Sequence, residues 1–123
     1  MAKAKILVID DEEIVRLSCT KALQSEGYDV KTAVSGKEGV ALIENETFDL
    51  VVIDLKMPVM DGLEVIKTIK QRYPGLKVII ISGYNIIEHT VESIACDTNH
   101  YLGKPFTPAE LVLRVNEVIG KCL

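Results

Sequence analysis

Short apolar runs alternate with amphipathic stretches along the whole chain. The runs Lys5–Ile9, Leu50–Ile53 and Val78–Ile81 are almost wholly apolar, as is typical of parallel strands that are buried on both faces. Two further runs, Tyr28–Ala33 and His100–Leu102, are also predicted to be strands. The first of these two is more polar, so we expect it nearer to an edge of the sheet.

Five amphipathic stretches separate or follow these strands. Over Glu13–Glu26 the apolar or small residues recur at helical spacing, and Gly27 supplies a stop. Ser35 with Glu38, and Thr107 with Glu110, have the spacing of capping boxes that begin helices. The other four helices are predicted over residues 36–45, 62–72 and 85–96 and from residue 108 onward.

Strands that alternate with helices predict an α/β fold. A doubly wound parallel sheet of five strands, flanked by five helices on its two faces, fits the pattern. A barrel is not favoured because it needs eight such units. With 123 residues the chain is expected to form one domain over residues 1–123.

Charge and composition exclude several classes of protein. The net charge of -4 argues against binding to the nucleic-acid backbone. No apolar run approaches the roughly 20 residues of a membrane span, and Ile6–Ile9 is too short for a signal peptide. We therefore expect a cytoplasmic protein that contacts neither membrane nor nucleic acid. Cys19, Cys96 and Cys122 are odd in number and lack CxxC spacing, which indicates neither disulfides nor a zinc site. We expect Cys19 and Cys96 to be small buried hydrophobic residues.

Polar residues follow four of the predicted strands. Asp10 and Asp11 follow the first strand, Asp54 ends the third, Ser82 the fourth, and Lys104 follows the fifth. The carboxyl ends of parallel strands lie at one edge of a sheet, where ligands bind. Each residue alone is better explained as a turn or cap residue, and Asp10 and Asp11 as caps of the first helix. Together they indicate a site.

The residue types of this site suit phosphoryl transfer. Three clustered carboxylates repel one another and need a cation, and an all-oxygen site suits Mg²⁺. Asp11 and Asp54 would bind the metal directly, and Asp10 through a water. Lys104 supplies a positive charge and Ser82 a donor, while the Asp54 carboxylate is the natural nucleophile.

A proline follows the site lysine. The residue before proline is biased to extended backbone, and this peptide bond is one that can be cis. Our hypothesis is that a cis bond between Lys104 and Pro105 aims the lysine at the site.

With these residues in place, the chain resembles the receiver domains of two-component response regulators over essentially its whole length. Four segments carry the resemblance: "ILVIDD" ending at Asp11, "DLKMPVMDG" from Asp54, "VIIISG" containing Ser82, and "YLGKPF" from Tyr101. The resemblance implies the flavodoxin-like strand order 2-1-3-4-5. It also implies a signalling domain that is not a turnover enzyme.

The resemblance assigns roles to the acidic residues. Asp54 would accept a phosphoryl group from a phosphohistidine on a sensor histidine kinase or a histidine phosphotransfer protein. Asp10, Asp11, Asp54 and the backbone carbonyl of Lys56 would hold Mg²⁺.

It also implies a switch. Ser82 and Lys104 would contact the phosphoryl oxygens, and Tyr101 would rotate into the space that Ser82 leaves. The surface of the fourth helix, fifth strand and fifth helix would then change, and a downstream effector domain or protein would read it. Formation of a homodimer on phosphorylation stays open. Leu113 and Ile86 lie off the main apolar stripes of their helices and are candidates for a partner face.

Lys56 and Tyr84 stand two residues after Asp54 and Ser82, at positions that tune phosphoryl lifetime in similar domains. Their long side chains are expected to hinder water and slow self-dephosphorylation. The chain departs from the family at Asp97–His100, where a Gly-Ala pair is usual. This departure affects the end of the fourth helix.

Three other readings remain. A phosphatase of the haloacid dehalogenase type would have a DxD motif after the first strand, where this chain has Asp10-Asp11-Glu12-Glu13. A flavodoxin-like cofactor binder would have Gly, Ser and Thr there, because consecutive acids repel phosphate. The third reading is a receiver-like interaction module that does not use phosphorylation.

Overall fold

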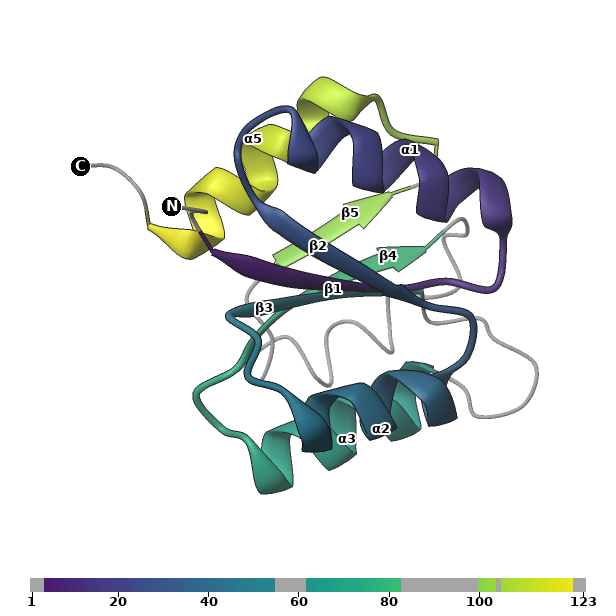
Figure 1. The fold of residues 1–123 in the computed structure, drawn as a ribbon, viewed down its shortest axis with the longest axis vertical. Coiled ribbons are helices and arrows are strands. Elements are labelled where there is room, and N and C mark those ends of the chain that lie inside the picture. The colour runs from purple at the N-terminus through teal and green to yellow at the C-terminus, as the bar shows by residue number, and fades with distance from the viewer. Residues whose placement is uncertain (1–3, 55–61, 83–99, 104, 121–123) are drawn as a thin grey trace.

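The five predicted strands form one parallel sheet in the order β2-β1-β3-β4-β5 (Figure 1). The structure is a computed structural model that describes residues 4–54, 62–82, 100–103 and 105–120, with residues 62, 63, 82, 100 and 101 described by their backbone. The polar strand β2 lies at an edge, and the strand order is the one that the resemblance implied. The strands are β1 (Lys5–Ile9), β2 (Asp29–Ala33), β3 (Leu50–Asp54), β4 (Lys77–Ser82) and β5 (His100–Gly103).

Helices cover both faces of the sheet, as a doubly wound fold requires. Figure 1 shows α1 and α5 on one face and α2 and α3 on the other. Among the described residues the helices are α1 (Glu13–Gln24), α2 (Gly36–Asn45), α3 (Gly62–Arg72) and α5 (Pro108–Ile119). The fourth predicted helix, over residues 85–96, lies outside the described residues. None of the described helices has the length and apolarity needed to cross a bilayer.

The strands divide their side chains between two apolar layers. In β1, Leu7 and Ile9 face α2 and α3, while Ile6 and Val8 face α1 and α5. All five residues of β3 are buried, including the terminal Asp54. The packing of these apolar layers therefore fixes where β1 and β3 end along the sheet. It thereby also fixes the position of the acidic residues that follow.

Helix α2 approaches β1 closely at Gly39. A β-carbon built on Gly39 would lie 2.3 Å from Cδ1 of Ile9, which is itself fully buried. Carbon atoms do not pack at that distance, so the absence of a side chain lets α2 lie directly over the end of β1. This contact holds the residue that precedes Asp10.

One of the two predicted capping boxes forms as expected. At α5 the Thr107 side chain accepts from the Glu110 N–H, and Glu110 accepts from the Thr107 N–H. At α2 the Ser35 side chain accepts from the Glu38 N–H at 3.2 Å. The Glu38 carboxylate, however, accepts from the N–H of Val34 at 2.7 Å. The capping box predicted at Ser35 and Glu38 was therefore wrong in its reciprocal bond, because the Glu38 carboxylate binds the N–H of the residue before the N-cap instead.

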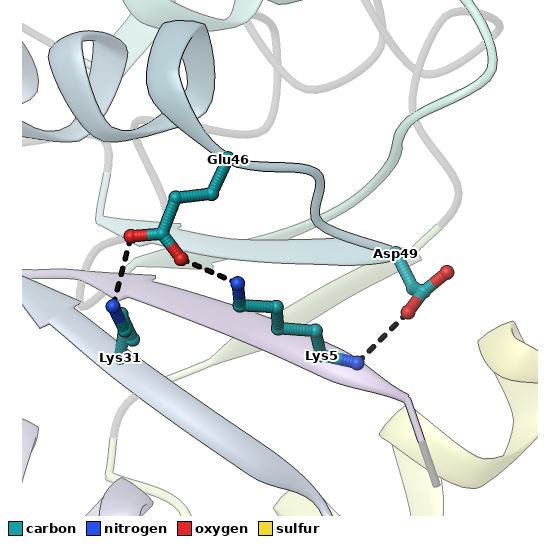
Figure 2. A network of polar contacts seen from close by, with 4 residues as sticks. All are labelled: Lys5, Lys31, Glu46 and Asp49. Carbon is teal, nitrogen blue, oxygen red and sulfur yellow. Dashed lines mark hydrogen bonds and ion pairs between the residues drawn. The ribbon is translucent and has the colours of Figure 1, made fainter. Parts of the chain in front are cut away.

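A polar network joins β1 and β2 to the segment between α2 and β3 (Figure 2). The Glu46 carboxylate, just after α2, binds the ammonium groups of Lys5 and Lys31, the latter at 2.8 Å. The backbone N–H of Lys5 donates to the Asp49 carboxylate at 2.8 Å. Hydrogen bonds donated by Lys31 and then by Lys5 lower the pKa of Glu46, and the hydrogen bond that Lys31 donates to Glu46 raises the pKa of Lys31. The network thus links β1, β2 and the chain entering β3.

We expect the Glu46→Gln variant to unfold at lower urea concentration than the wild type at pH 7. Because the pKa of Glu46 is lowered in the folded state, its contribution is present above the unfolded-state pKa and is lost as pH falls through the folded-state value. The difference between the two proteins should therefore shrink in acid. Urea unfolding between pH 7 and pH 3 measures it.

The matched control is Glu44→Gln, which removes a single exposed pair with Arg72. Such surface pairs contribute little, so this variant should stay close to the wild type throughout. A Glu46→Gln difference that is equally large at both ends of the pH range would contradict the electrostatic explanation.

Candidate functional site

The register of the sheet brings four strand ends to one edge. Ile9 pairs with Ile53, which places the next residues of these strands, Asp10 and Asp54, at the same level. Asp54 in turn pairs with Ile81, the residue before Ser82. Ser82 pairs with Gly103, the residue before Lys104. The carboxyl ends of β1, β3, β4 and β5 therefore converge, as the sequence predicted.

Three carboxylates meet at this edge. One oxygen from each of Asp10, Asp11 and Asp54 lies within 4.8 Å of the other two. Asp10 is 0% exposed and Asp54 5% exposed, whereas Asp11 is exposed to solvent. Like charges held so close, two of them away from water, repel one another. The cluster is therefore an arrangement that a cation would stabilise.

Asp10 is held through its backbone and its side chain. Its N–H donates to the carbonyl of Ala33 at the end of β2 (3.2 Å), and its Oδ1 accepts from the N–H of Glu12 (2.9 Å). Its carbonyl accepts from Nη1 of Arg16 (2.9 Å). A role of Asp10 as a helix cap thus explains the bond that its Oδ1 accepts. It does not explain why Asp54 lies beside it. The N-cap residue is Glu12, whose side chain makes no capping bond.

The contact from Arg16 was not predicted from the sequence. It joins a side chain to a backbone carbonyl six residues earlier. Residue types and helical spacing indicate which side chains share a face, but they do not show which carbonyl a long side chain reaches. The only signal was a single arginine in the first part of the helix that follows the acidic pair.

The other predicted site residues are described in part or lie outside the described residues. Ser82 is the last residue of β4, and Tyr101 is the second residue of β5, with Ile80 as its strand partner. Their side chains, and the roles proposed for them, stay predictions. Pro105 is exposed. Lys56, Tyr84, Lys104, the Lys104–Pro105 peptide bond and residues 97–99 lie outside the described residues.

Two smaller predictions concern residues away from the site. Cys19 is buried in the apolar layer under α1, as expected of a small hydrophobic residue. Leu113 on α5 is 61% exposed, which agrees with its place off the apolar stripe. Cys96, Cys122 and Ile86 lie outside the described residues.

The donors of the acidic cluster fit a hard divalent cation. All three are carboxylate oxygens, which Mg²⁺ prefers. Three such oxygens within 4.8 Å of one another could hold one ion between them.

Comparison with known sequences gives a family match over most of the chain. Residues 6–116 match the family described as "Response regulator receiver domain". The response regulator SaeR of Staphylococcus aureus (strain USA300) is 32% identical over 116 residues, which make up 94% of this chain and 50% of SaeR. The chain thus spans about half the length of the curated relatives it matches.

Solved structures resemble the chain over nearly its whole length. A CheY-like response regulator receiver domain protein from Methanospirillum hungatei JF-1 has a TM-score of 0.89 and 35% identity, covering 96% of this chain and 94% of that one. The response regulator protein TrrA from Thermotoga maritima, in complex with Mg(2+)-BeF, has a TM-score of 0.85 and 32% identity. That match covers 94% of this chain and 99% of TrrA.

Proposed function

The chain belongs to the response regulator receiver family, and from this premise we propose that it is the phosphoacceptor of a two-component phosphorelay. Asp54 takes a phosphoryl group from a phosphohistidine of a sensor histidine kinase or a histidine phosphotransfer protein. The observation that carries the proposal is the acidic cluster, whose three oxygens lie within 4.8 Å of one another at the carboxyl edge of the sheet. A cluster of like charges, two of them buried, is useful where a cation and an anionic group are to be bound.

The proposal includes Mg²⁺ held by Asp10, Asp11, Asp54 and the backbone carbonyl of Lys56. When bound, the ion would offset the charge of the phosphoryl oxygens. The fit of the three carboxylates to a hard cation supports this assignment. So does the complex of the similar protein TrrA with Mg(2+)-BeF.

In the transfer step, a carboxylate oxygen of Asp54 attacks the phosphorus of the donor. The new O–P bond forms as the P–N bond to the donor imidazole breaks, and its electron pair stays on the imidazole nitrogen. Asp54 is suited to this role because its backbone is paired in β3, at the edge of the sheet where Asp10 and Asp11 also lie. Transfer therefore depends mainly on positioning and on charge neutralisation.

Recognition of the phosphoryl group would bias the switch. We assign its contacts to the Ser82 hydroxyl and the Lys104 ammonium, and the coupled rotation to Tyr101. A phosphoryl group adds a charge of roughly -1.5 to -2 and three acceptors, which favours whichever arrangement supplies these donors. Lys56 and Tyr84 would then set the lifetime by hindering water.

The partners proposed are those of a cytoplasmic phosphorelay. Upstream stands a histidine kinase or phosphotransfer protein, and downstream an effector domain or protein that reads the surface formed by the fourth helix, β5 and α5. A homodimer formed on phosphorylation is a further state to test. The relatives that extend to about twice the length of this chain support a separate output unit.

The function is tested by incubating the protein with a small phosphodonor and Mg²⁺. Intact-mass spectrometry should show one added phosphoryl group, and a chelator should prevent its addition. No uptake under any of these conditions would overturn the proposal and leave the phosphorylation-independent interaction module.

The same samples separate the two other readings. Steady turnover of small phosphomonoesters would indicate a phosphatase, and bound flavin colour would indicate a cofactor binder. The proposed receiver shows neither, because its phosphoryl group stays on Asp54 until water removes it.

A further inference from the structure

We propose that Arg16 is a positioning residue of the acidic site. By holding the carbonyl of Asp10, it fixes the peptide between Asp10 and Asp11 and thereby the direction of the Asp11 carboxylate. The inference rests on the proposed function and extends it, because it names a residue outside the carboxylate cluster that sets affinity for Mg²⁺.

The contact joins α1 to the loop that carries the acids. Nη1 of Arg16 lies 2.9 Å from the carbonyl oxygen of Asp10. The backbone of Arg16 is itself fixed, since its N–H donates to the carbonyl of Glu12 at 3.1 Å. A hydrogen bond with one charged partner is stronger than a neutral one. The guanidinium therefore ties the first turn of the helix to the end of β1.

The bonded carbonyl belongs to the peptide unit that links the two acids. Because that unit is planar, the direction of the Asp10 carbonyl sets the direction of the Asp11 N–H. It also restrains the bonds on either side of the plane, on which the position of the Asp11 side chain depends.

Arg16 should act on Asp11 more than on Asp10. The Asp10 side chain is fully buried and is held separately by the N–H of Glu12. Asp11 is exposed, so packing fixes its side chain less than it fixes that of Asp10. The bond from Arg16 is thus a direct restraint on the peptide unit that leads into Asp11.

The alternative effect of Arg16 has the opposite sign. A guanidinium close to a cation site repels the cation, so a purely electrostatic role would mean that removing Arg16 tightens Mg²⁺ binding. The side chain is half-buried and lines a groove beside β2 together with Thr20 and Thr32. Solvent in the groove partly screens the charge of Arg16. The peptide between Asp10 and Asp11, by contrast, is held by a direct hydrogen bond. Positioning should therefore dominate, and removal should weaken binding.

The test is a titration of Mg²⁺ followed by amide chemical shifts in the full chain, without any phosphodonor. We expect Arg16→Met to raise the dissociation constant for Mg²⁺ about tenfold, at the lower end of the range for residues that orient metal ligands. Arg16→Lys should restore part of the affinity because it keeps the charge and a donor. In the metal-free spectra the amide of Asp11 should shift in Arg16→Met, while those of Val52 and Ile80 in the core stay in place.

The matched control is Arg72→Met, which removes an arginine paired with Glu44 at the end of α3. It should bind Mg²⁺ as the wild type does. If Arg16→Met does not fold, Arg16→Gln carries the same expectation.

The outcomes distinguish this inference from the function on which it rests. A wild type that binds Mg²⁺ and accepts a phosphoryl group, beside neutral Arg16 variants with unchanged or tighter Mg²⁺ binding, overturns the positioning role alone. A wild type that neither binds Mg²⁺ nor accepts a phosphoryl group overturns the proposed function and this inference with it.

Discussion

The Asp54→Ala variant is expected to take up no phosphoryl group from a small phosphodonor under conditions in which the wild type takes up one. Alanine removes the carboxylate that forms the new bond to phosphorus. The loss should be complete, because the other two carboxylates follow β1 and do not occupy the position of Asp54, and Asp10 is also fully buried and held through Oδ1 by the N–H of Glu12. Intact-mass spectrometry of both proteins with Mg²⁺ measures it.

Two further variants make the result specific. Asp54→Asn keeps the shape of the side chain and should also take up nothing, which separates loss of the nucleophile from a cavity in the site. Asp29→Ala removes an exposed carboxylate at the start of β2, at the other end of the sheet, and should take up one group. Stoichiometric uptake by Asp54→Ala would assign the acceptor role elsewhere, with the exposed Asp11 as the first candidate.

Much of the fold follows from the apolar runs. Leu50–Asp54 and Lys77–Ser82 form the interior strands β3 and β4 because near-continuous apolar side chains need cover on both faces. Tyr28–Ala33 was expected at an edge because it is polar, and β2 is there. The order of the interior strands could not be predicted in this way, since runs of Val and Ile do not indicate which strands pair. That order came from the resemblance to a family.

The site was predictable to the extent that it follows from strand ends. A sheet in which Ile9 pairs with Ile53 must bring Asp10 and Asp54 together, whatever the loops do. The contact of Arg16 with the Asp10 carbonyl depends on the path of one side chain, which no spacing rule encodes. The same holds for Glu38, whose carboxylate accepts from the N–H of Val34 and not from that of Ser35, as a capping box requires.

Asp10→Asn should have opposite effects on metal binding and on stability. Loss of one charge should weaken Mg²⁺ binding roughly tenfold to a hundredfold, as expected for a carboxylate that acts on the metal directly or through water. In chelator, however, the variant should be more stable than the wild type by about 1 kcal/mol. Asp10 is 0% exposed, and its carboxylate lies within 4.8 Å of two others, so its charge is repelled in the metal-free protein. Asparagine keeps an Oδ1 acceptor for the N–H of Glu12, which limits the structural loss.

Urea unfolding with chelator and with Mg²⁺ measures both effects in the same samples. At a concentration ten times its dissociation constant, Mg²⁺ should stabilise the wild type by about 1.4 kcal/mol and the variant by much less. Asp49→Asn, which changes a carboxylate at the amino end of β3, should respond to Mg²⁺ as the wild type does. A variant that is less stable than the wild type in chelator would mean that the protein itself, without a metal, balances the charge of Asp10. Asp10 would then be a structural residue of the fold, and Asp11 and Asp54 would be the carboxylates left to hold Mg²⁺.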